Sequence, residues 1–225
     1  MKDAGKADTT HKSAISDEDL ASIFKLGAQL HEIIKGKNVN IPGIQSEKIP
    51  SVVQKFVILM VGIHQARRGR EGFDSLKKTD FKVFEHPKIG KYVKQVVTRS
   101  SKNHKDDSQD SRLGGILVCS ENCFGLNCGE LFLNYIAKLD PEYEYLFAKP
   151  RRATKDGALK RVFELKTWYE KAKAGKNTVS QALPTLSEIL GLERITNDKM
   201  RPTAIQLLKR AGFSDREIMN TSGKF

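Results

Sequence analysis

The stretch N-D-K-M-R-P-T-A-I-Q-L-L-K-R-A-G-F, residues 197–213, has the signals of a complete helix, and the rest of the chain is interpreted outward from it. Asn197 or Asp198 can cap its start, Pro202 suits the first turn, and Gly212 can end it. Its apolar side is formed by Ala204, Ile205, Leu207 and Leu208. Arg201 falls in the first turn, where a planar guanidinium and free backbone amides can point at one phosphate. We therefore expect Arg201 to bind an anion.

The composition favours a polyanionic partner. In 225 residues, 39 lysines and arginines outnumber 27 aspartates and glutamates, which gives a formal charge of +12. Nucleic acid is the simplest partner for such a protein, and the alternative is a basic protein that binds no polyanion. The longest apolar run, Phe56 to Ile63, is too short to span a bilayer, so no membrane partner is expected. Three cysteines are too few for a disulfide framework and fit a reducing compartment.

Helical signals dominate the first third of the chain. The largely polar residues 1–15 predict a disordered tail, and one domain is expected over residues 16–225. Ser16 is the expected cap of a first helix, with Asp19 at the third helical position. Residues 52–64 are apolar on nearly all sides, which predicts a central buried helix.

The middle of the chain alternates between strand and helix signals. Three strands are predicted, at residues 81–84, 92–97 and 114–118. Two more helices are expected, one from Cys128 and one over residues 178–190. Trp168 and Tyr169 are interpreted as core residues rather than as a surface on which bases stack. These elements together predict a mainly helical α+β domain with a small antiparallel sheet.

The candidate zinc ligands are the three cysteines and His104. Cys119, Cys123 and Cys128 have the spacing C-x-x-x-C-x-x-x-x-C, which lacks the C-x-x-C pair of most zinc sites. Buried or incidental thiols explain this spacing better, so no metal and no other cofactor is expected.

The helix around Arg201 and the residues after it resemble the end of a tyrosine recombinase catalytic domain. That family has His-x-x-Arg at the opening of the helix, Ala-Gly at its end, then a short helix and Gly-His. The closest form is the crypton-type domain of transposons, which also occurs in domesticated form in animal nuclear proteins of the zinc-finger MYM and glutamine-rich families. Here Asp198 stands at the position of the first His and Lys224 at that of the second. The sequence ends before the position of the nucleophilic Tyr.

An arginine-rich stretch after the central helix resembles the first signature of the same family. R-R-G-R-E, residues 67–71, is followed by K-K-T-D-F at residues 77–81, in the order that the family shows. Arg68 matches the first arginine of the family best, and Arg67 and Arg70 remain alternatives.

Residues 101–104, S-K-N-H, resemble the Thr-Lys-Asn-His hairpin that carries a catalytic lysine in the family. The resemblance gives this role to Lys102, and its neighbour Lys105 remains an alternative. W-Y at residues 168–169 and G-K-N-T at residues 175–178 match a further family segment. Contacts with DNA are also expected from six basic residues: Arg67, Arg70, Lys105, Arg151, Arg152 and Lys176.

The resemblance implies a phosphoryl-transfer site that is incomplete here. In the family, a Tyr attacks a DNA phosphodiester and forms a 3′-phosphotyrosine, two arginines stabilise the charge on the phosphate, and a Lys protonates the leaving oxygen. In this sequence the phosphate would be held by Arg68, Lys102, Arg201 and Lys224. None of the five tyrosines follows Gly223, so no strand cleavage is expected.

The expected function is therefore that of a nuclear, transposon-derived domain of the DNA-integration family, which binds DNA without cutting it and can form a homo-oligomer. One alternative is a protein-interaction module of a nuclear or transcriptional protein. Another is an active recombinase whose Tyr segment lies outside this sequence. Salt-dependent binding of DNA separates the first expectation from the interaction module.

Overall fold

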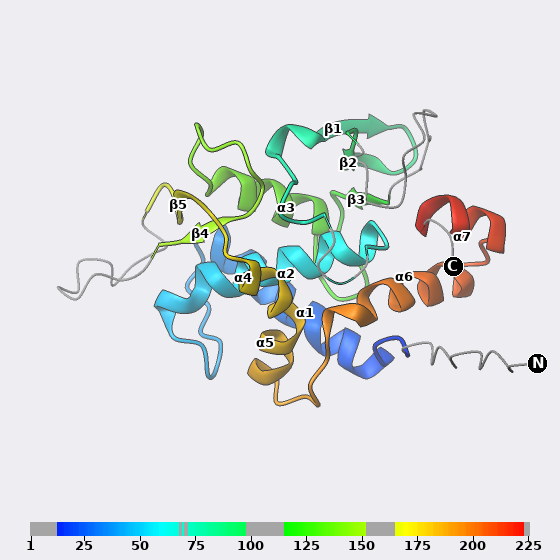
Figure 1. Cartoon of the computed structure of the whole chain (residues 1–225), viewed down its shortest axis with the longest axis horizontal. Helices are drawn as coiled ribbons and strands as arrows, with labels where there is room; N and C mark the ends of the chain where they lie inside the picture. The colour runs from blue at the N-terminus through cyan, green and yellow to red at the C-terminus, as the bar shows by residue number, and fades with distance from the viewer. Residues whose placement is uncertain (1–12, 68, 70–71, 98–114, 152–164, 223–225) are drawn as a thin grey trace, which may run out of the picture.

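Helix α2 (Ile49–His64) forms the centre of the molecule (Figure 1). The computed structural model describes residues 13–67, 69, 72–97, 115–151 and 165–222. Because α2 is apolar on nearly every side, other elements can cover it all round, and its residues from Val52 to Ile63 are buried except for Lys55. The helices that pack around it are α1 (Asp17–Ile34), α3 (Cys128–Ala137), α5 (Ala182–Ile189) and α6 (Met200–Arg210).

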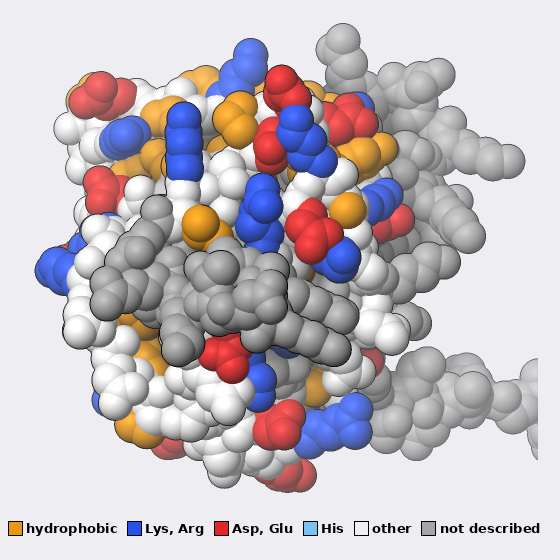
Figure 2. Space-filling view, turned by 90° about the vertical axis from the view of Figure 1, so that its left-hand side faces the viewer, with side chains coloured by type: hydrophobic (Ala, Val, Ile, Leu, Met, Phe, Trp, Pro, Cys, Tyr) orange, Lys and Arg blue, Asp and Glu red, His pale blue; other side chains and the backbone are white. Residues whose placement is uncertain are grey.

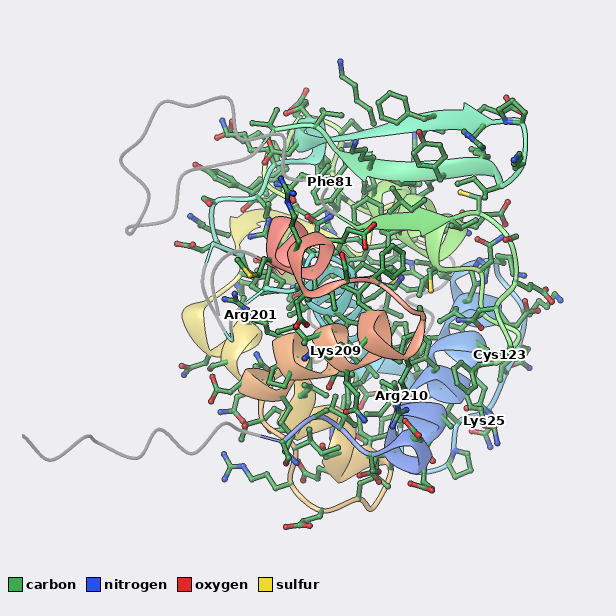
Figure 3. All side chains as sticks on the ribbon, turned by 90° about the vertical axis from the view of Figure 1, so that its right-hand side faces the viewer. Lys25, Phe81, Cys123, Arg201, Lys209 and Arg210 are labelled. Carbon is green, nitrogen blue, oxygen red and sulfur yellow. The ribbon has the colours of Figure 1, made fainter. Side chains whose placement is uncertain are left out.

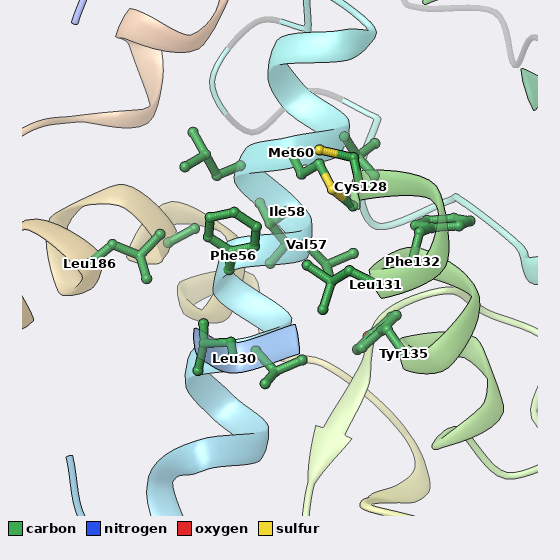
Figure 4. Close-up of a cluster of buried hydrophobic side chains, with 14 of the residues drawn as sticks. Leu30, Phe56, Val57, Ile58, Met60, Cys128, Leu131, Phe132, Tyr135 and Leu186 are labelled. Carbon is green, nitrogen blue, oxygen red and sulfur yellow. The ribbon is translucent and has the colours of Figure 1, made fainter. Parts of the chain in front are cut away.

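The core is formed where side chains of α2 lie between those of α3 and α5. Figure 4 shows Phe56 on the side of Leu186 of α5, with Leu131 and Tyr135 of α3 on the opposite side. All four side chains are fully buried, and each contributes about 1.5–3 kcal/mol of hydrophobic free energy. Helix α1 approaches α2 at Gly27, where a side-chain carbon would lie 2.1 Å from the ring of Phe56. Only a glycine permits this contact without movement of the ring.

Several helix ends follow the sequence signals. The hydroxyl of Ser16 accepts a hydrogen bond from the backbone N–H of Asp19 at 3.1 Å, so the predicted cap of α1 is confirmed. Helices α1, α5 and α6 each end at a glycine with positive φ. After α6, for example, Gly212 has φ 85° and donates its N–H to the carbonyl of Lys209 at 3.0 Å. These glycines satisfy the last carbonyls of their helices.

A three-stranded antiparallel sheet consists of β1 (Phe81–His86), β2 (Gly90–Gln95) and β3 (Ile116–Val118), in the order β1-β2-β3. The expected small antiparallel sheet is thus confirmed, although its second strand ends at Gln95 rather than at residue 97. One face of the sheet packs on α3, where the rings of Phe81 and Phe132 are 4.8 Å apart. Val93 and Leu117 are buried on this packed face.

A second, two-stranded sheet pairs β4 (Ala148–Pro150) with β5 (Tyr169–Lys173). Trp168 and Tyr169 are fully buried, and the hydroxyl of Tyr169 donates to the carbonyl of Pro50 at 2.8 Å, which confirms their interpretation as core residues. Shorter elements complete the described part of the chain: η1 (Ser46–Lys48), η2 (Lys78–Asp80), α4 (Lys176–Ser180), η4 (Asn197–Lys199) and α7 (Asp215–Ser222).

Some sequence predictions are wrong in detail. The helix expected over residues 178–190 consists of two helices, α4 and α5, with Gln181 between them. The packed chain begins before Ser16, because Ile15 is buried and donates its N–H to the hydroxyl of Thr203 at 2.9 Å. The apolar side expected on α6 is only partly covered, since Leu207 is 38% exposed. No helix in the described part of the chain is long and apolar enough to cross a membrane.

Candidate phosphate-binding site

The chain leaves α2 through a strained turn. Ala66 has φ 46°, the only positive φ among the non-glycine residues that the structure describes. Ala66 donates its N–H to the carbonyl of Ile63 at 3.0 Å, and Arg67 donates to that of Gly62 at 2.8 Å, which is the pattern that glycine supports at the other helix ends. A left-handed alanine costs about 1–2 kcal/mol, and the buried Ala66 methyl group offsets part of this cost. The turn brings Arg67 back beside the end of the helix.

Arg67 lies in a partly enclosed environment between the turn and the sheet. Its guanidinium donates to Oε1 of Gln95 at 2.8 Å and lies 5.5 Å from the centre of the Phe73 ring. Burial lowers the pKa of Arg67 to about 10, and the nearby Asp80 carboxylate opposes this shift. The buried Nε atom of Arg67 has no hydrogen-bond partner among the described residues. The sequence did not single out Gln95 or Phe73, because their contacts with Arg67 are long-range.

The start of β3 touches the same end of α2. A side-chain carbon on Gly115 would lie 1.7 Å from the carbonyl oxygen of His64, so the two backbones are in direct contact. The side chain of Gln65 donates to the carbonyl of Gly115 at 3.3 Å. Since Gln95 ends β2, both ends of the connection between β2 and β3 are anchored beside Arg67.

The segment that leads into α6 approaches this region from another side. A side-chain carbon on Gly69 would lie 2.8 Å from Oδ1 of Asp198, and one on Gly62 would lie 2.3 Å from the sulfur of Met200. Asp198 is exposed, whereas Met200 is fully buried. The turn after α2, the end of β2, the start of β3 and the residues around η4 are therefore neighbours, although they lie far apart in the sequence.

Arg201 follows Met200 directly and is half-buried. Figure 3 shows it at the start of α6, away from Lys209 and Arg210 near the other end. The short helix η4 continues into α6, and the N–H of Met200 donates to the carbonyl of Asn197. Arg201 is therefore the second residue of α6 and lies in its first turn, as predicted, although η4 precedes this helix and the N–H of Met200 is already hydrogen-bonded. The start of α6 therefore offers fewer free backbone amides to an anion than the sequence predicts.

Neither Asn197 nor Asp198 caps α6, which has no side-chain cap at its start. Asn197 is buried, its Oδ1 accepts the N–H of Leu183 at 3.0 Å, and its Nδ2 donates to the carbonyl of Val179. The predicted capping role is thus replaced by a link from η4 to α4 and α5. These hydrogen bonds anchor η4 and so fix the start of α6, where Arg201 lies.

The remaining candidates fall into two groups. Lys176 lies in α4 with its side chain outside the described part of the chain, and six other candidates lie outside the described residues altogether: Arg68, Arg70, Lys102, Lys105, Arg152 and Lys224. Arg151 is described at the end of β4, where its N–H donates to the carbonyl of Trp168 at 3.0 Å. Its guanidinium donates to the hydroxyl of Thr167 at 3.3 Å. Arg151 therefore joins β4 to the segment before β5, at the opposite end of the molecule from α7 (Figure 1).

The surface at the β4–β5 end carries charges of both signs. Figure 2 shows lysine and arginine side chains interspersed with acidic ones on this face. Lys149 pairs with Glu170 at 2.8 Å, and Lys171 pairs with Glu142. Because such pairs cancel each other at a distance, this end attracts a polyanion weakly.

The cysteines do not gather with other ligands. Cys119, Cys123 and Cys128 are free thiols, and burial raises the pKa of Cys128 to about 12. Within the described ranges, no group of three His, Cys, Asp or Glu side chains is placed to hold a metal ion.

Comparison with protein-family models and with curated proteins identifies no relative. No protein-family model matches the sequence, and no curated protein is significantly similar to it. Function is therefore inferred from the residues of this chain and their arrangement.

Proposed function

We propose that this chain is a DNA-binding domain of tyrosine-recombinase type, related to crypton transposons, which acts in the nucleus and holds DNA without cutting it. The formal charge of +12 supports a polyanionic partner. Phosphate contacts dominate the affinity of such proteins for DNA, and arginine suits them because its planar fork can donate two hydrogen bonds.

The observation that carries this proposal is the meeting of separate chain segments at the end of α2. Each segment leads, within the sequence, to a cation that the resemblance assigns to the phosphate. Arg68 follows Arg67, Lys102 lies in the connection between Gln95 and Gly115, and Arg201 follows η4. If the motif matches were due to chance, the segments that carry them would not be expected to meet at one place in the fold.

Substitution of Arg201 tests the proposal. Arg201→Lys keeps the charge but loses the fork, so it should weaken binding to duplex DNA by about 1–3 kcal/mol with little change in salt dependence. Arg201→Ala should weaken binding at least as much and reduce the slope of log K against log salt by about one unit. Fluorescence anisotropy over a range of salt concentrations measures both quantities.

Arg210→Ala is the matched control, because Arg210 lies on the same helix and pairs with Asp17 at 2.5 Å. It removes the same charge from an exposed ion pair, so both stability and DNA affinity should change little. If the Arg201 variants unfold the protein while the affinity of the folded fraction is unchanged, Arg201 is a structural residue and the DNA-binding proposal fails.

A second candidate function is supported by exposed apolar side chains on and between α6 and α7, two helices that contact each other. Leu207, Phe213 and Met219 are 38%, 48% and 42% exposed. Large exposed apolar side chains that lie close in the fold often mark a protein–protein contact. A protein-interaction module, the alternative function, would use this surface and would show no salt-dependent affinity for DNA.

A further inference from the structure

The outward face of the β1-β2-β3 sheet has an unusual composition. Side chains that are directly opposite each other in an antiparallel pair share a face, and the register places Lys82 opposite Lys94 and Phe84 opposite Tyr92. These residues alternate with Phe81 and Val93 of the packed face, so they point away from α3. Figure 1 shows the sheet at the edge of the molecule, with α3 on its inner side.

Two aromatic rings lie on this outward face. The rings of Phe84 and Tyr92 are nearly parallel, with an interplanar angle of 22° and centroids 5.6 Å apart. Phe84 is 38% exposed and Tyr92 is half-buried. Their arrangement leaves apolar ring surface open to solvent. Exposed apolar surface contributes nothing to the stability of an isolated domain.

The lysines beside the rings form a like-charge pair. Lys82 and Lys94 are directly opposite each other, an arrangement that destabilises a sheet. On the opposite face, near the turn, Glu85 lies opposite Lys91, so that pair has opposite charges. The register gives the outward face no acidic residue, and no ion pair involves Lys82 or Lys94 within the part of the chain that is described. A bound anion would remove the repulsion between the two lysines.

We propose that this outward face binds single-stranded nucleic acid, with unpaired bases stacked on Phe84 and Tyr92 and the backbone phosphates beside Lys82 and Lys94. Aromatic platforms flanked by cations suit single strands, because the base faces of a duplex are already stacked on each other. A protein partner fits less well, because lysine is depleted in protein interfaces. This surface contains neither Arg67 nor Arg201 and therefore goes beyond the proposed function.

The test measures binding of a fluorescent oligo(dT) of about 12 nucleotides to the full chain by fluorescence anisotropy. Phe84→Ala and Tyr92→Ala should each weaken binding by about 5-fold or more, the effect of losing one stacked base. Phe84→Leu keeps the apolar bulk without the ring and should weaken binding similarly, which keeps the test valid if the alanine variant unfolds. Lys82→Gln with Lys94→Gln should reduce the salt slope by about 1.4 units and leave the unfolding midpoint unchanged or higher.

Val83→Ala and Lys91→Gln are the controls, because they lie on the same strands but on the opposite face from Phe84 and Tyr92. They should leave the affinity for oligo(dT) nearly unchanged. The proposal is overturned if the wild-type chain does not bind oligo(dT), if the ring variants bind normally, or if the controls weaken binding equally. Loss of self-association in Phe84→Ala, with oligo(dT) binding unchanged, would also overturn it and assign the face to a protein contact.

These experiments test the two proposed binding sites independently. Phe84→Ala should lose the single strand and keep the duplex, whereas Arg201→Ala should lose the duplex and keep the single strand. Absence of duplex binding alone would therefore count against the proposed function and not against the sheet surface.

Discussion

The tyrosines show what individual residues contribute to this fold. Tyr135 and Tyr169 are fully buried, and their hydroxyls donate to the carbonyls of Leu146 at 2.9 Å and Pro50 at 2.8 Å. Burial raises the pKa of both hydroxyls and also that of Tyr143. A nucleophilic tyrosine must reach DNA and lose its proton, and the two buried residues are suited to neither step.

We therefore predict that this chain forms no covalent adduct with DNA. A nicked suicide substrate, which traps a phosphotyrosine, should yield only free protein on a denaturing gel. An adduct mapped to any of the five tyrosines would contradict this prediction. An adduct formed only by a longer protein would support the alternative in which the nucleophile lies outside this sequence.

Two histidines link stability to pH. Burial lowers the pKa of His31 and, despite a hydrogen bond to the carbonyl of Met60 at 2.8 Å, also that of His64. The unfolded chain therefore takes up protons near pH 6.5 before the folded protein does, and the free energy of unfolding must fall as pH falls below 6.5. Each histidine can lower it by at most about 1.4 kcal/mol at pH 5.5.

Urea unfolding at pH 7.5 and 5.5 measures this effect. His31→Gln and His64→Gln should each reduce the difference between the two pH values. His86→Gln, which changes an exposed histidine, should leave it unaltered. A free energy of unfolding that stays constant or rises toward pH 5.5 would contradict the assignment.

At the scale of elements, the contact between α2 and β3 depends on one glycine. Gly115→Ala places a methyl group against the carbonyl of His64, and backbone atoms cannot move aside as a flexible side chain can. We predict a loss of at least about 2 kcal/mol in the free energy of unfolding, near the upper part of the range for overpacking. Gly175→Ala is the control, because nothing lies within 4 Å of the added carbon. Equal unfolding midpoints for the two variants would show that this contact is wrong.

Local signals predicted most of the elements. The cap at Ser16, the glycines after α1, α5 and α6, and the apolar run of α2 are each properties of a few adjacent residues, so the sequence alone indicates them. The break at Gln181 also has a local signal, because Pro184 cannot donate to the carbonyl of Ser180 and suits only the first turn of α5. The left-handed Ala66 carries no such signal. Ala66 is buried, and pattern rules do not include the distant contacts that bury it.

The candidate site was less predictable than the fold for the same reason. Arg201 stands out in the sequence because of the helix signals around it, yet the side-chain cap predicted at Asn197 or Asp198 is absent and η4 precedes the helix instead. The position of Arg67 depends on Gln95, which lies 28 residues further along the chain. A sequence indicates which residue types are available for binding a phosphate, but the packing of α2 against the sheet decides where they lie.

At the scale of the whole molecule, some basic side chains form ion pairs with acidic ones and others do not. The β4–β5 end pairs its lysines with acids such as Glu170 and Glu142, and Figure 2 shows both signs on that face. On the outward face of the sheet, Lys82 and Lys94 have no ion pair within the described part of the chain, whereas Arg67 lies near the carboxylate of Asp80. A polyanion would therefore be attracted to the outward face of the sheet more than to the β4–β5 end.

The most direct measurement for the central claim is the affinity of the wild-type chain for duplex DNA between 50 and 200 mM salt, salt concentrations over which phosphate contacts have large effects. Phosphates held by cations release counterions, so log K should fall linearly with log salt, with a slope of about −0.9 for each contact. Contacts from the three segments that meet at α2 predict a slope of about −2.7 or steeper. Absence of binding at the lowest salt concentration, or a slope close to zero, would contradict the proposal that this chain is a DNA-binding domain.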